Sequence, residues 1–334
     1  MLNLESHWYR SSHTLLTILL LPFSWIFRCA VAIRYFLYRI HFKKIHYFPV
    51  PVIVVGNITV GGTGKTPLVI WLANFLKSQG LRPGIVSRGV GGKKHSTPEW
   101  VESHSDPEVV GDEAVILARR SSSPVVVSIN RVAAVRELLA KTDCNLVITD
   151  DGLQHYQLGR DVEIAVIDGD RGFGNGSLLP AGPLREPLSR LKKVNFIIRQ
   201  GDALQGEFAL HVSGNNLLSL QDENIQISLD IFRNKTVHAV AGIGNPSRFF
   251  SMLRAKKLNI IEHVFPDHHL YQAAELDFLD SFPIIMTEKD AVKCSDFADE
   301  RFWYLPVSAT LDERFEGALL RKLNVRKKEY ENVE

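Results

Sequence analysis

The stretch TVGGTGKTP, at residues 59–67, is the feature that most constrains how this chain can fold. An apolar run, Val50–Val55, precedes it and predicts a buried strand, and Leu68–Leu76 after it predicts a helix. Glycines allow successive backbone N–H groups to point at one anion, and the N-terminus of the following helix adds partial positive charge. A strand, a turn ending in Gly-Lys-Thr and a helix together predict a phosphate-binding loop.

The polar groups of this stretch have expected roles in holding a nucleotide. Lys65 would reach the β- and γ-phosphates, and the Thr66 hydroxyl would ligate Mg²⁺. The stretch departs from the standard pattern at Thr59, where a glycine is usual, and a glycine-rich turn in an unrelated protein is the alternative. The expected phosphate-binding residues are Thr59, Val60, Gly61, Gly62, Thr63, Gly64, Lys65 and Thr66.

Composition and charge bound the class of protein. The chain has 334 residues, enough for about two domains, and its net charge of +2 gives no indication of a nucleic acid partner. The three cysteines are far apart and show no metal-ligand spacing. The charge is unevenly distributed, because the first 48 residues hold one acid, Glu5, against six basic residues: Arg10, Arg28, Arg34, Arg39, Lys43 and Lys44.

The N-terminal region, 1–48, has the composition of a helix that lies in a membrane interface. Residues 11–27 are apolar apart from His13 and a few hydroxyl-bearing side chains, but they are fewer than the roughly 20 that a membrane span needs, and Pro22 is expected to interrupt them. From residue 26 to residue 47, aromatic and aliphatic side chains alternate with Arg and Lys. The alternatives are a helix packed on its own domain and a signal peptide, although no small-residue cleavage site follows the apolar run.

The rest of the chain predicts an α/β fold. Short apolar strands alternate with helices over 49–206, which indicates a P-loop NTPase-type domain with a parallel sheet covered on both faces. The alternating pattern of 207–235 predicts a short two-stranded antiparallel connector, and 236–334 predicts a smaller α/β/α domain. In that domain we expect a helix over Ala273–Leu279 and a last strand over Phe302–Val307.

Two adjacent carboxylates follow a buried strand, at a position where a nucleotide-binding fold needs ligands for Mg²⁺. Asn145–Thr149 predicts the strand, and Asp150 and Asp151 come directly after it. Either carboxylate would serve as a ligand to the metal or to its bound water, and the sequence leaves open which one does. The alternative is that the two acids cap a helix or stabilise a turn.

Asp112 and His268 are candidates for accepting a proton. Asp112 opens an expected helix that runs through Arg120, so an N-terminal capping role is the alternative. His268 and His269 follow a strand end and a proline. A carboxylate can take a hydroxyl proton itself or orient an imidazole that does so, but the sequence alone does not bring the two residues together.

Two further motifs resemble nucleotide-binding signatures only in part. The GIG at 242–244 lacks the third glycine of a dinucleotide-binding fingerprint, and a proline intervenes. The TEKD at 287–290 differs from the guanine-reading pattern Asn-Lys-x-Asp, because its lysine is adjacent to its aspartate. Binding of GTP is therefore not indicated.

Seven short segments occur in order across nearly the whole chain: GNITVGGTGKTP (56–67), SRG (87–89), GDE (111–113), DDGLQH (150–155), LPAGPLRE (179–186), PDHH (266–269) and TEKDA (287–291). As a set, these segments resemble the tetraacyldisaccharide 4'-kinase family. The sequence departs from the usual family pattern at Val90, where we expect a tyrosine, and at Ala114-Val115, where a Pro-Leu-type pair is usual.

The resemblance implies phosphorylation by ATP, with Mg²⁺, of the 4' hydroxyl of a lipid A precursor, a tetraacylated disaccharide 1-phosphate. It implies two α/β/α domains joined by a small sheet, with the active site between them. It also implies action at the cytoplasmic face of the inner membrane of a Gram-negative bacterium. Together with the basic N-terminal segment, this predicts a peripheral or monotopic protein on the anionic inner leaflet.

The resemblance also suggests roles for the candidate residues. The glycine-rich loop and Lys65 would hold ATP, Thr66 with one of the paired aspartates would hold Mg²⁺, and Asp112, helped by His268, would accept the sugar hydroxyl proton. Arg88 and Arg185 are weaker candidates for holding anionic groups. A P-loop ATPase acting as a membrane-associated assembly factor and a membrane-bound nucleotide sensor are the alternatives to a kinase.

Overall fold

Two mainly parallel β-sheets organise the computed structural model, which describes residues 4–10 and 12–331. Residues 1–3, 11 and 332–334 of the expected N- and C-terminal segments lie outside the described residues. Within the described part, the larger sheet has nine strands in the order β15-β8-β7-β6-β1-β5-β2-β4-β3. Its edge strands β15 and β3 pair antiparallel and the strands between them pair parallel. The mixed α/β class with parallel sheets is therefore as the sequence predicts.

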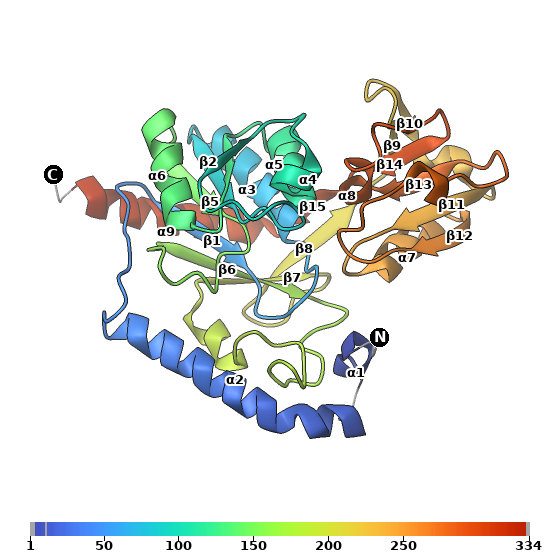
Figure 1. Ribbon diagram of the computed structural model, residues 1–334. Helices are drawn as coiled ribbons and strands as arrows, with labels where there is room; N and C mark the ends of the chain where they lie inside the picture. Colours follow the sequence, from blue (N-terminus) through green and yellow to red (C-terminus); the bar gives the residue numbers. More distant parts are fainter. Residues whose placement is uncertain (1–3, 11, 332–334) are drawn as a thin grey trace.

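The strands of the larger sheet are β1 (Val52–Gly56), β2 (Pro83–Ser87), β3 (Glu99–Val101), β4 (Val125–Val127), β5 (Leu146–Thr149), β6 (Val162–Asp168), β7 (Phe196–Gln200), β8 (Phe208–Ser213) and β15 (Ser308–Leu311). Helices α3 (Lys65–Ser78), α5 (Asp112–Ser121) and α9 (Glu313–Glu331) pack on one face, and α6 (Arg131–Lys141) with neighbouring loops packs on the other (Figure 1). Every residue of β1 is buried, as expected for an uninterrupted apolar strand covered on both faces. We call this sheet with its helices the first unit.

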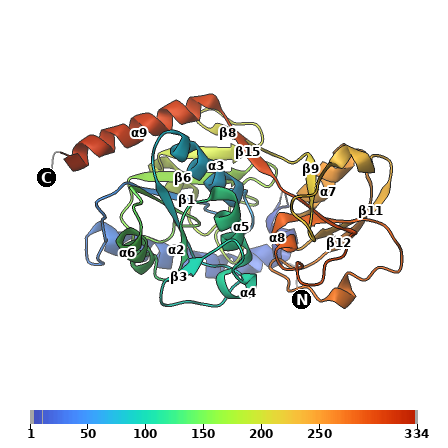
Figure 2. The same cartoon turned by 90° about the horizontal axis from the view of Figure 1, so that it is seen from above.

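The second unit is built on the smaller sheet, which has six strands among the described residues, in the order β10-β9-β14-β13-β11-β12. They are β9 (Asn216–Ser219), β10 (Gln226–Ser228), β11 (Thr236–Ala241), β12 (Asn259–Val264), β13 (Ile284–Thr287) and β14 (Phe302–Leu305). Helix α7 (Pro246–Ala255) packs on one face through its two phenylalanines. The short helix α8 (Glu288–Ala291) packs against α5 of the first unit, and Figure 2 shows the two units side by side with these helices between them.

The segment expected as a connector, 207–235, is divided between the two sheets. β8 joins the larger sheet beside β7, whereas β9 and β10 join the smaller one. The chain returns along the same path, because β14 pairs antiparallel with β9 and β15 pairs antiparallel with β8. The ribbon between the sheets therefore consists of 208–219 and 302–311. Alternation along a sequence predicts a strand but not its partner, so the second half of this ribbon could not be foreseen.

Two expectations about the second unit are wrong. The helix expected over Ala273–Leu279 is a single 3-10 turn, Ala273–Glu275. The chain then extends so that Phe278 stacks on the imidazoles of His238 and His263, a packing that helical geometry does not provide. The sequence predicts the strand over Phe302–Val307 to be the last strand of the chain. It is β14, and a further strand, β15, follows it before the C-terminal helix begins.

A single apolar helix, α2 (Leu15–Arg39), lies along the outside of the first unit after the short helix α1 (Leu4–Trp8) (Figure 1). Pro22 lies inside α2, so the expected interruption is wrong. Proline has a φ that suits a helix, although it lacks an N–H donor. One turn is anchored by Ser24, whose hydroxyl donates to Leu178 O at 2.8 Å and accepts from Ala181 N at 3.0 Å. The helix is long and apolar enough to cross a membrane, and 11% of its most apolar window is buried in the protein.

Candidate active site

The loop between β1 and α3 has the backbone conformation that its glycines predict. Gly61 and Gly64 have positive φ values of 100° and 80°, which residues with side chains rarely adopt. Gly64 directly precedes Lys65, the first residue of α3. The loop therefore leads straight into the N-terminus of a 14-residue helix that lies beside buried β1.

Val60 and Thr59 are engaged within the protein. The Val60 N–H donates to Pro183 O at 2.8 Å, so this amide already has an acceptor. Thr59 is buried and forms an isolated antiparallel bridge with Leu184. These groups are bound by the Pro-Ala-Gly-Pro segment of the loop after β6. Within the described part of the chain, no loop or turn acceptor takes the backbone N–H groups of Gly61–Thr66.

Asp151 meets the lysine of the glycine-rich loop. Lys65 Nζ lies 3.5 Å from Asp151 Oδ1, and Arg185 Nη1 donates to Asp151 Oδ2 at 3.1 Å. Burial alone would raise the pKa of Asp151, but the charges of Lys65, Arg185 and Arg131 outweigh burial and hold the pKa well below its usual range. Asp151 is therefore ionised, and its φ of 49° turns the chain sharply after β5.

Asp150 is buried beside it, with 1% of its surface exposed. Its Oδ1 has no hydrogen-bond partner among the described residues. Burial, with the charge of Glu113 nearby, raises the pKa of Asp150 to about 7. Arg131 Nη2 donates to the backbone oxygens of Asp150 and Asp151 at 2.8 and 2.9 Å. No helix begins in the described residues 152–187, which rules out a helix-capping role for the two acids.

Asp112 and His268 meet across the two units. His268 Nδ1 lies 3.0 Å from Asp112 Oδ2 and 3.1 Å from Asp112 Oδ1. Asp112 is 2% exposed, and Gly111 rather than Asp112 occupies the N-cap position of α5. Asp112 Oδ1 also accepts from the Glu113 N–H at 2.8 Å, so the carboxylate contacts both the first turn of α5 and His268. His268 has a φ of 61°, a conformation that is rare for residues with side chains and is concentrated at functional sites.

The electrostatics of this contact favour an ion pair. Burial alone would lower the pKa of His268, but the hydrogen bond and the charge of Asp112 outweigh it and raise the pKa. Burial alone would raise the pKa of Asp112, but the hydrogen bond from His268 and the charge of Lys289 lower it. The carboxylate and the imidazole thus stabilise each other's charged forms.

Lys289 is a member of the site that sequence reasoning missed. Its Nζ donates to Asp267 Oδ1 at 2.9 Å and to Glu113 Oε1 at 3.1 Å, and it lies 3.3 Å from His268 Nε2. An ammonium can only donate, so in a neutral His268 Nε2 accepts from Lys289 and the ring proton lies on Nδ1, facing Asp112. In the ion pair both ring nitrogens carry protons, and Nε2 then has no lone pair for Lys289. The signal that could have revealed Lys289 is a lysine between two acids directly after a strand, since such strand ends hold the ligand sites of parallel sheets.

Glycines allow the loops of the two units to approach each other closely. A Cβ added to Gly91 would lie 2.6 Å from His268 Nδ1, so the loop after β2 covers the Asp112–His268 pair. A Cβ added to Gly244 would lie 2.8 Å from the backbone nitrogen of Gly62 and 3.5 Å from Asp267 Oδ2. The loop after β11 therefore lies between the glycine-rich loop and the segment that carries His268. Arg88, in the loop after β2, is exposed.

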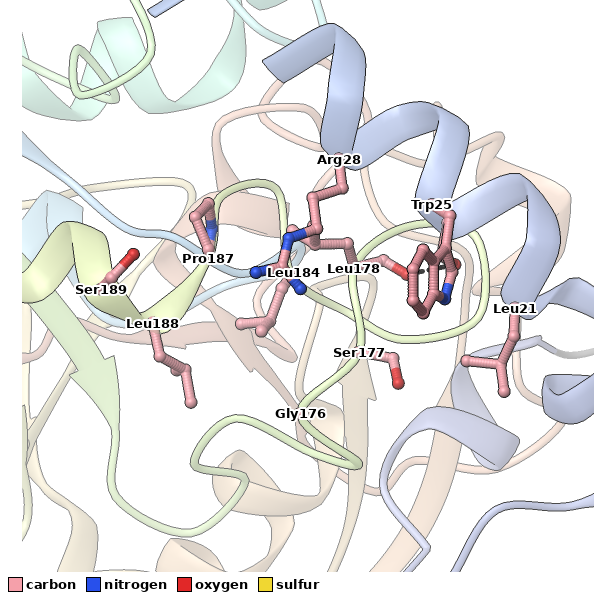
Figure 3. A pocket seen from close by; sticks show the side chains of 11 residues that line it. Leu21, Trp25, Arg28, Gly176, Ser177, Leu178, Leu184, Pro187, Leu188 and Ser189 are labelled. Carbon is pink, nitrogen blue, oxygen red and sulfur yellow. Dashed lines mark hydrogen bonds between the residues drawn. The ribbon is translucent and has the colours of Figure 1, made fainter. Parts of the chain in front are cut away.

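A pocket of about 370 Å³ lies between α2 and the loop that precedes η1 (Leu188–Lys193) (Figure 3). Leu21, Trp25 and Arg28 extend from α2, and the opposite wall is formed mainly by Leu178, Leu184 and Leu188. The lining combines leucines and Trp25 with serines, and Arg28 is its charged member. Because Leu184 pairs with Thr59, this wall is continuous with the glycine-rich loop.

Comparisons with known proteins agree with this geometry. The family described as Tetraacyldisaccharide-1-P 4'-kinase matches residues 16–324 of the chain. The chain belongs to this family. A tetraacyldisaccharide 4'-kinase from Nitrosococcus oceani is 50% identical over 330 residues, covering 98% of this chain and 96% of that protein. One from Coxiella burnetii is 48% identical over 324 residues, covering 97% of this chain and 96% of that protein.

A solved structure of the family is also similar. The crystal structure of LpxK from Aquifex aeolicus in complex with ATP has a TM-score of 0.78 and 30% sequence identity to this chain. The match covers 92% of this chain and 100% of that one. Family membership and the fold thus confirm the resemblance found in the sequence.

Proposed function

We propose that this chain is a kinase that transfers the γ-phosphate of ATP to the 4' hydroxyl of a tetraacyldisaccharide 1-phosphate. Its family and its near full-length relatives are named for this activity. One observation supports this activity for this chain in particular: two pairs of charged side chains flank the loop that carries Gly244. Lys65 contacts Asp151 on the side of the glycine-rich loop, and Asp112 contacts His268 on the other side. Phosphoryl transfer needs an anion cradle and a proton acceptor at one place.

The glycine-rich loop is the proposed donor site. Backbone N–H groups of Gly61–Thr66 and the Lys65 ammonium would hold the triphosphate, because loop amides and a helix N-terminus favour anions. Lys65 would leave Asp151 for the phosphates, since Arg185 remains within 3.1 Å of that carboxylate. The first unit, which holds the expected domain 49–206 together with β8, β15 and α9, is then the P-loop kinase domain. The second unit brings His268 and Lys289 to it.

Asp150, Asp151 and Thr66 are the proposed Mg²⁺ ligands. Mg²⁺ prefers oxygen ligands, usually one or two carboxylates together with water and phosphate oxygens. The buried Oδ1 of Asp150, which has no hydrogen-bond partner among the described residues, fits such a role because an orphaned carboxylate oxygen needs a cation or donor. The metal would neutralise charge on the phosphates, and Asp150 and Asp151 would keep it beside Lys65.

The Asp112–His268 pair is the proposed proton acceptor. Asp112 is buried, and its lowered pKa keeps it ionised, so its carboxylate is available to accept a hydroxyl proton. In its neutral form His268 donates to the carboxylate through Nδ1 and accepts from Lys289 through Nε2. The imidazole is thereby fixed by two contacts, and Asp112 accepts the proton as the hydroxyl oxygen attacks.

The apolar side of α2 is the proposed membrane contact. Its exposed large side chains include Leu19, Trp25 and Ile26, at 63%, 71% and 68% exposure. An amphipathic helix with such a face binds at the interface of a bilayer, and its basic residues favour an anionic leaflet. The pocket beside Trp25, whose walls include Leu178, Leu184 and Leu188, would receive part of an acyl chain. The protein would then act at the cytoplasmic face of the inner membrane as a peripheral or monotopic enzyme.

A turnover assay tests the proposal. The purified full chain is given ATP and Mg²⁺ with and without tetraacyldisaccharide 1-phosphate, and release of ADP is followed. We expect ADP release that depends on the lipid acceptor. Rapid ADP release without acceptor would instead support an ATPase, and binding of ATP with no release under either condition would support a nucleotide sensor.

A further inference from the structure

Arg248 links the second unit to the strand ends beside the glycine-rich loop. It lies on α7, and its Nη2 donates to Asp168 Oδ1 at 2.6 Å and to Asp170 Oδ2 at 2.8 Å. Its Nη1 donates to Gln200 Oε1. The side chains of Arg248 and Asp168 are 23% and 4% exposed, so water screens their contact only weakly. One side chain of the second unit thus holds three acceptors of the first.

The acceptors of Arg248 are connected to the loop that carries Lys65. Asp168 and Gln200 end β6 and β7 and are partners in the register of these strands. β6 also pairs with β1, whose end begins the glycine-rich loop. A Cβ added to Gly64 would lie 2.8 Å from Gln200 Oε1. The atom that accepts from Arg248 is therefore the atom packed against the residue before Lys65.

The start of α7 makes a second contact with the same region. Asn245, the N-cap residue of α7, is buried, and its Nδ2 lies 3.5 Å from Asp168 Oδ2. Gly244 lies so close to Gly62 that a Cβ there would be 2.8 Å from the Gly62 nitrogen. Movement of α7 would therefore move the Gly244 loop against the glycine-rich loop, and Arg248 is the charged group that fixes α7 at this point.

We propose that Arg248 is a positioning residue for phosphoryl transfer. It fixes the position of the glycine-rich loop relative to the Asp112–His268 pair. This depends on the placement of the second unit, because His268 belongs to that unit. The inference rests on the proposed function, because it assumes that these two groups act on one substrate pair. Arg248 reaches the glycine-rich loop through Gln200, whose Oε1 accepts from Arg248 and packs against Gly64.

The test compares Arg248→Met with a matched control on the same helix. Arg254→Met removes an arginine that is 57% exposed and pairs with Glu262 of its own unit. A displacement of reacting groups by about 1 Å can cost about 10²-fold in rate. We therefore expect kcat to fall about 10²-fold in Arg248→Met, and backbone amides of 59–64 to exchange with deuterium faster. Arg254→Met should leave both unchanged.

Two further variants keep the test decisive if Arg248→Met folds poorly. Arg248→Lys keeps the charge but loses the forked donor, so it should hold Asp168 without Gln200 and show an intermediate kcat. Asp168→Asn should change kcat and loop exchange in the same direction as Arg248→Met.

The outcomes separate the two proposals. If the wild-type chain transfers no phosphate to the lipid, the proposed function fails. If the wild type is active and the Arg248 variants keep full kcat with unchanged loop exchange, the positioning role is wrong. Equal losses in Arg254→Met would attribute the effect to α7 stability, and a rise in KM for ATP with unchanged loop exchange would mean that Arg248 touches the nucleotide. Either result would overturn the inference.

Discussion

Removing either half of the Asp112–His268 pair should slow phosphoryl transfer much more than it weakens ATP binding. Loss of a general base costs about 10² to 10⁴ in rate. Because the two side chains are 3.0 Å apart and hold one another's geometry, they should act as a unit. We expect Asp112→Asn and His268→Ala each to lower kcat by this range, and the double variant to be little worse than the worse single one.

The same contact should contribute to stability over a defined pH window. A hydrogen bond between charged groups contributes about 1.5 to 3 kcal/mol, and both side chains are mostly buried here. The pKa of Asp112 is lowered and that of His268 is raised. The contribution is therefore present between the ordinary pKa values of the two groups, at about 4 and about 6.5. It is lost as pH rises through the raised pKa of His268.

The assay measures kcat, KM for ATP and urea-induced unfolding for each variant at pH 6 and at pH 9. His269→Gln is the matched control, because His269 is the next residue and pairs with Glu275 at 3.0 Å, away from Asp112. It should leave kcat nearly unchanged. The loss of stability in Asp112→Asn should be larger at pH 6 than at pH 9. Fully multiplicative kinetic losses, or a stability loss that grows with pH, would refute the reasoning.

Three further predictions concern metal binding, the membrane and the core. Asp150→Asn and Asp151→Asn should both lower activity, and the variant that lacks the metal ligand should need more Mg²⁺; full activity in both would remove them from the site. Deleting residues 1–39 should weaken vesicle co-sedimentation and raise KM for the lipid more than for ATP, and replacing basic residues of this segment with Gln should matter mainly at low salt, at about 1 kcal/mol each. Undiminished vesicle binding by the truncated chain would locate the membrane contact elsewhere. Phe315→Ala should destabilise the fold by about 3 to 5 kcal/mol in urea unfolding, because Phe315 is fully buried against Phe196 and Phe208; wild-type stability would contradict the packing of α9.

Much of the first unit could be predicted because its signals are local. The glycine-rich loop, the strand before Asp150 and the helix that Asp112 opens each depend on a few neighbouring residues. Their parallel arrangement follows from alternating strands and helices, which leave few possible topologies. The family resemblance rested on the same short segments.

The remaining features depend on contacts between distant segments. No local pattern shows that 302–311 pairs with 208–219, or that Pro183 takes the Val60 N–H. The contact of Asp112 with His268 joins residues 156 positions apart. Lys289 lies in a segment that partly resembles a guanine-reading motif, and Arg248 lies in no motif. The roles of both residues depend on how closely the second unit approaches the first.

Analysis of the reaction product tests the central claim most directly. The full chain is incubated with ATP, Mg²⁺ and tetraacyldisaccharide 1-phosphate, and the lipid is analysed by mass spectrometry with fragmentation to locate the new group, beside a Lys65→Met variant. The account predicts a lipid heavier by one phosphate at the 4' position for the wild type and none for the variant, because the variant lacks the main side-chain cation for the phosphates. Unchanged lipid with the wild type, or full transfer by Lys65→Met, would contradict it.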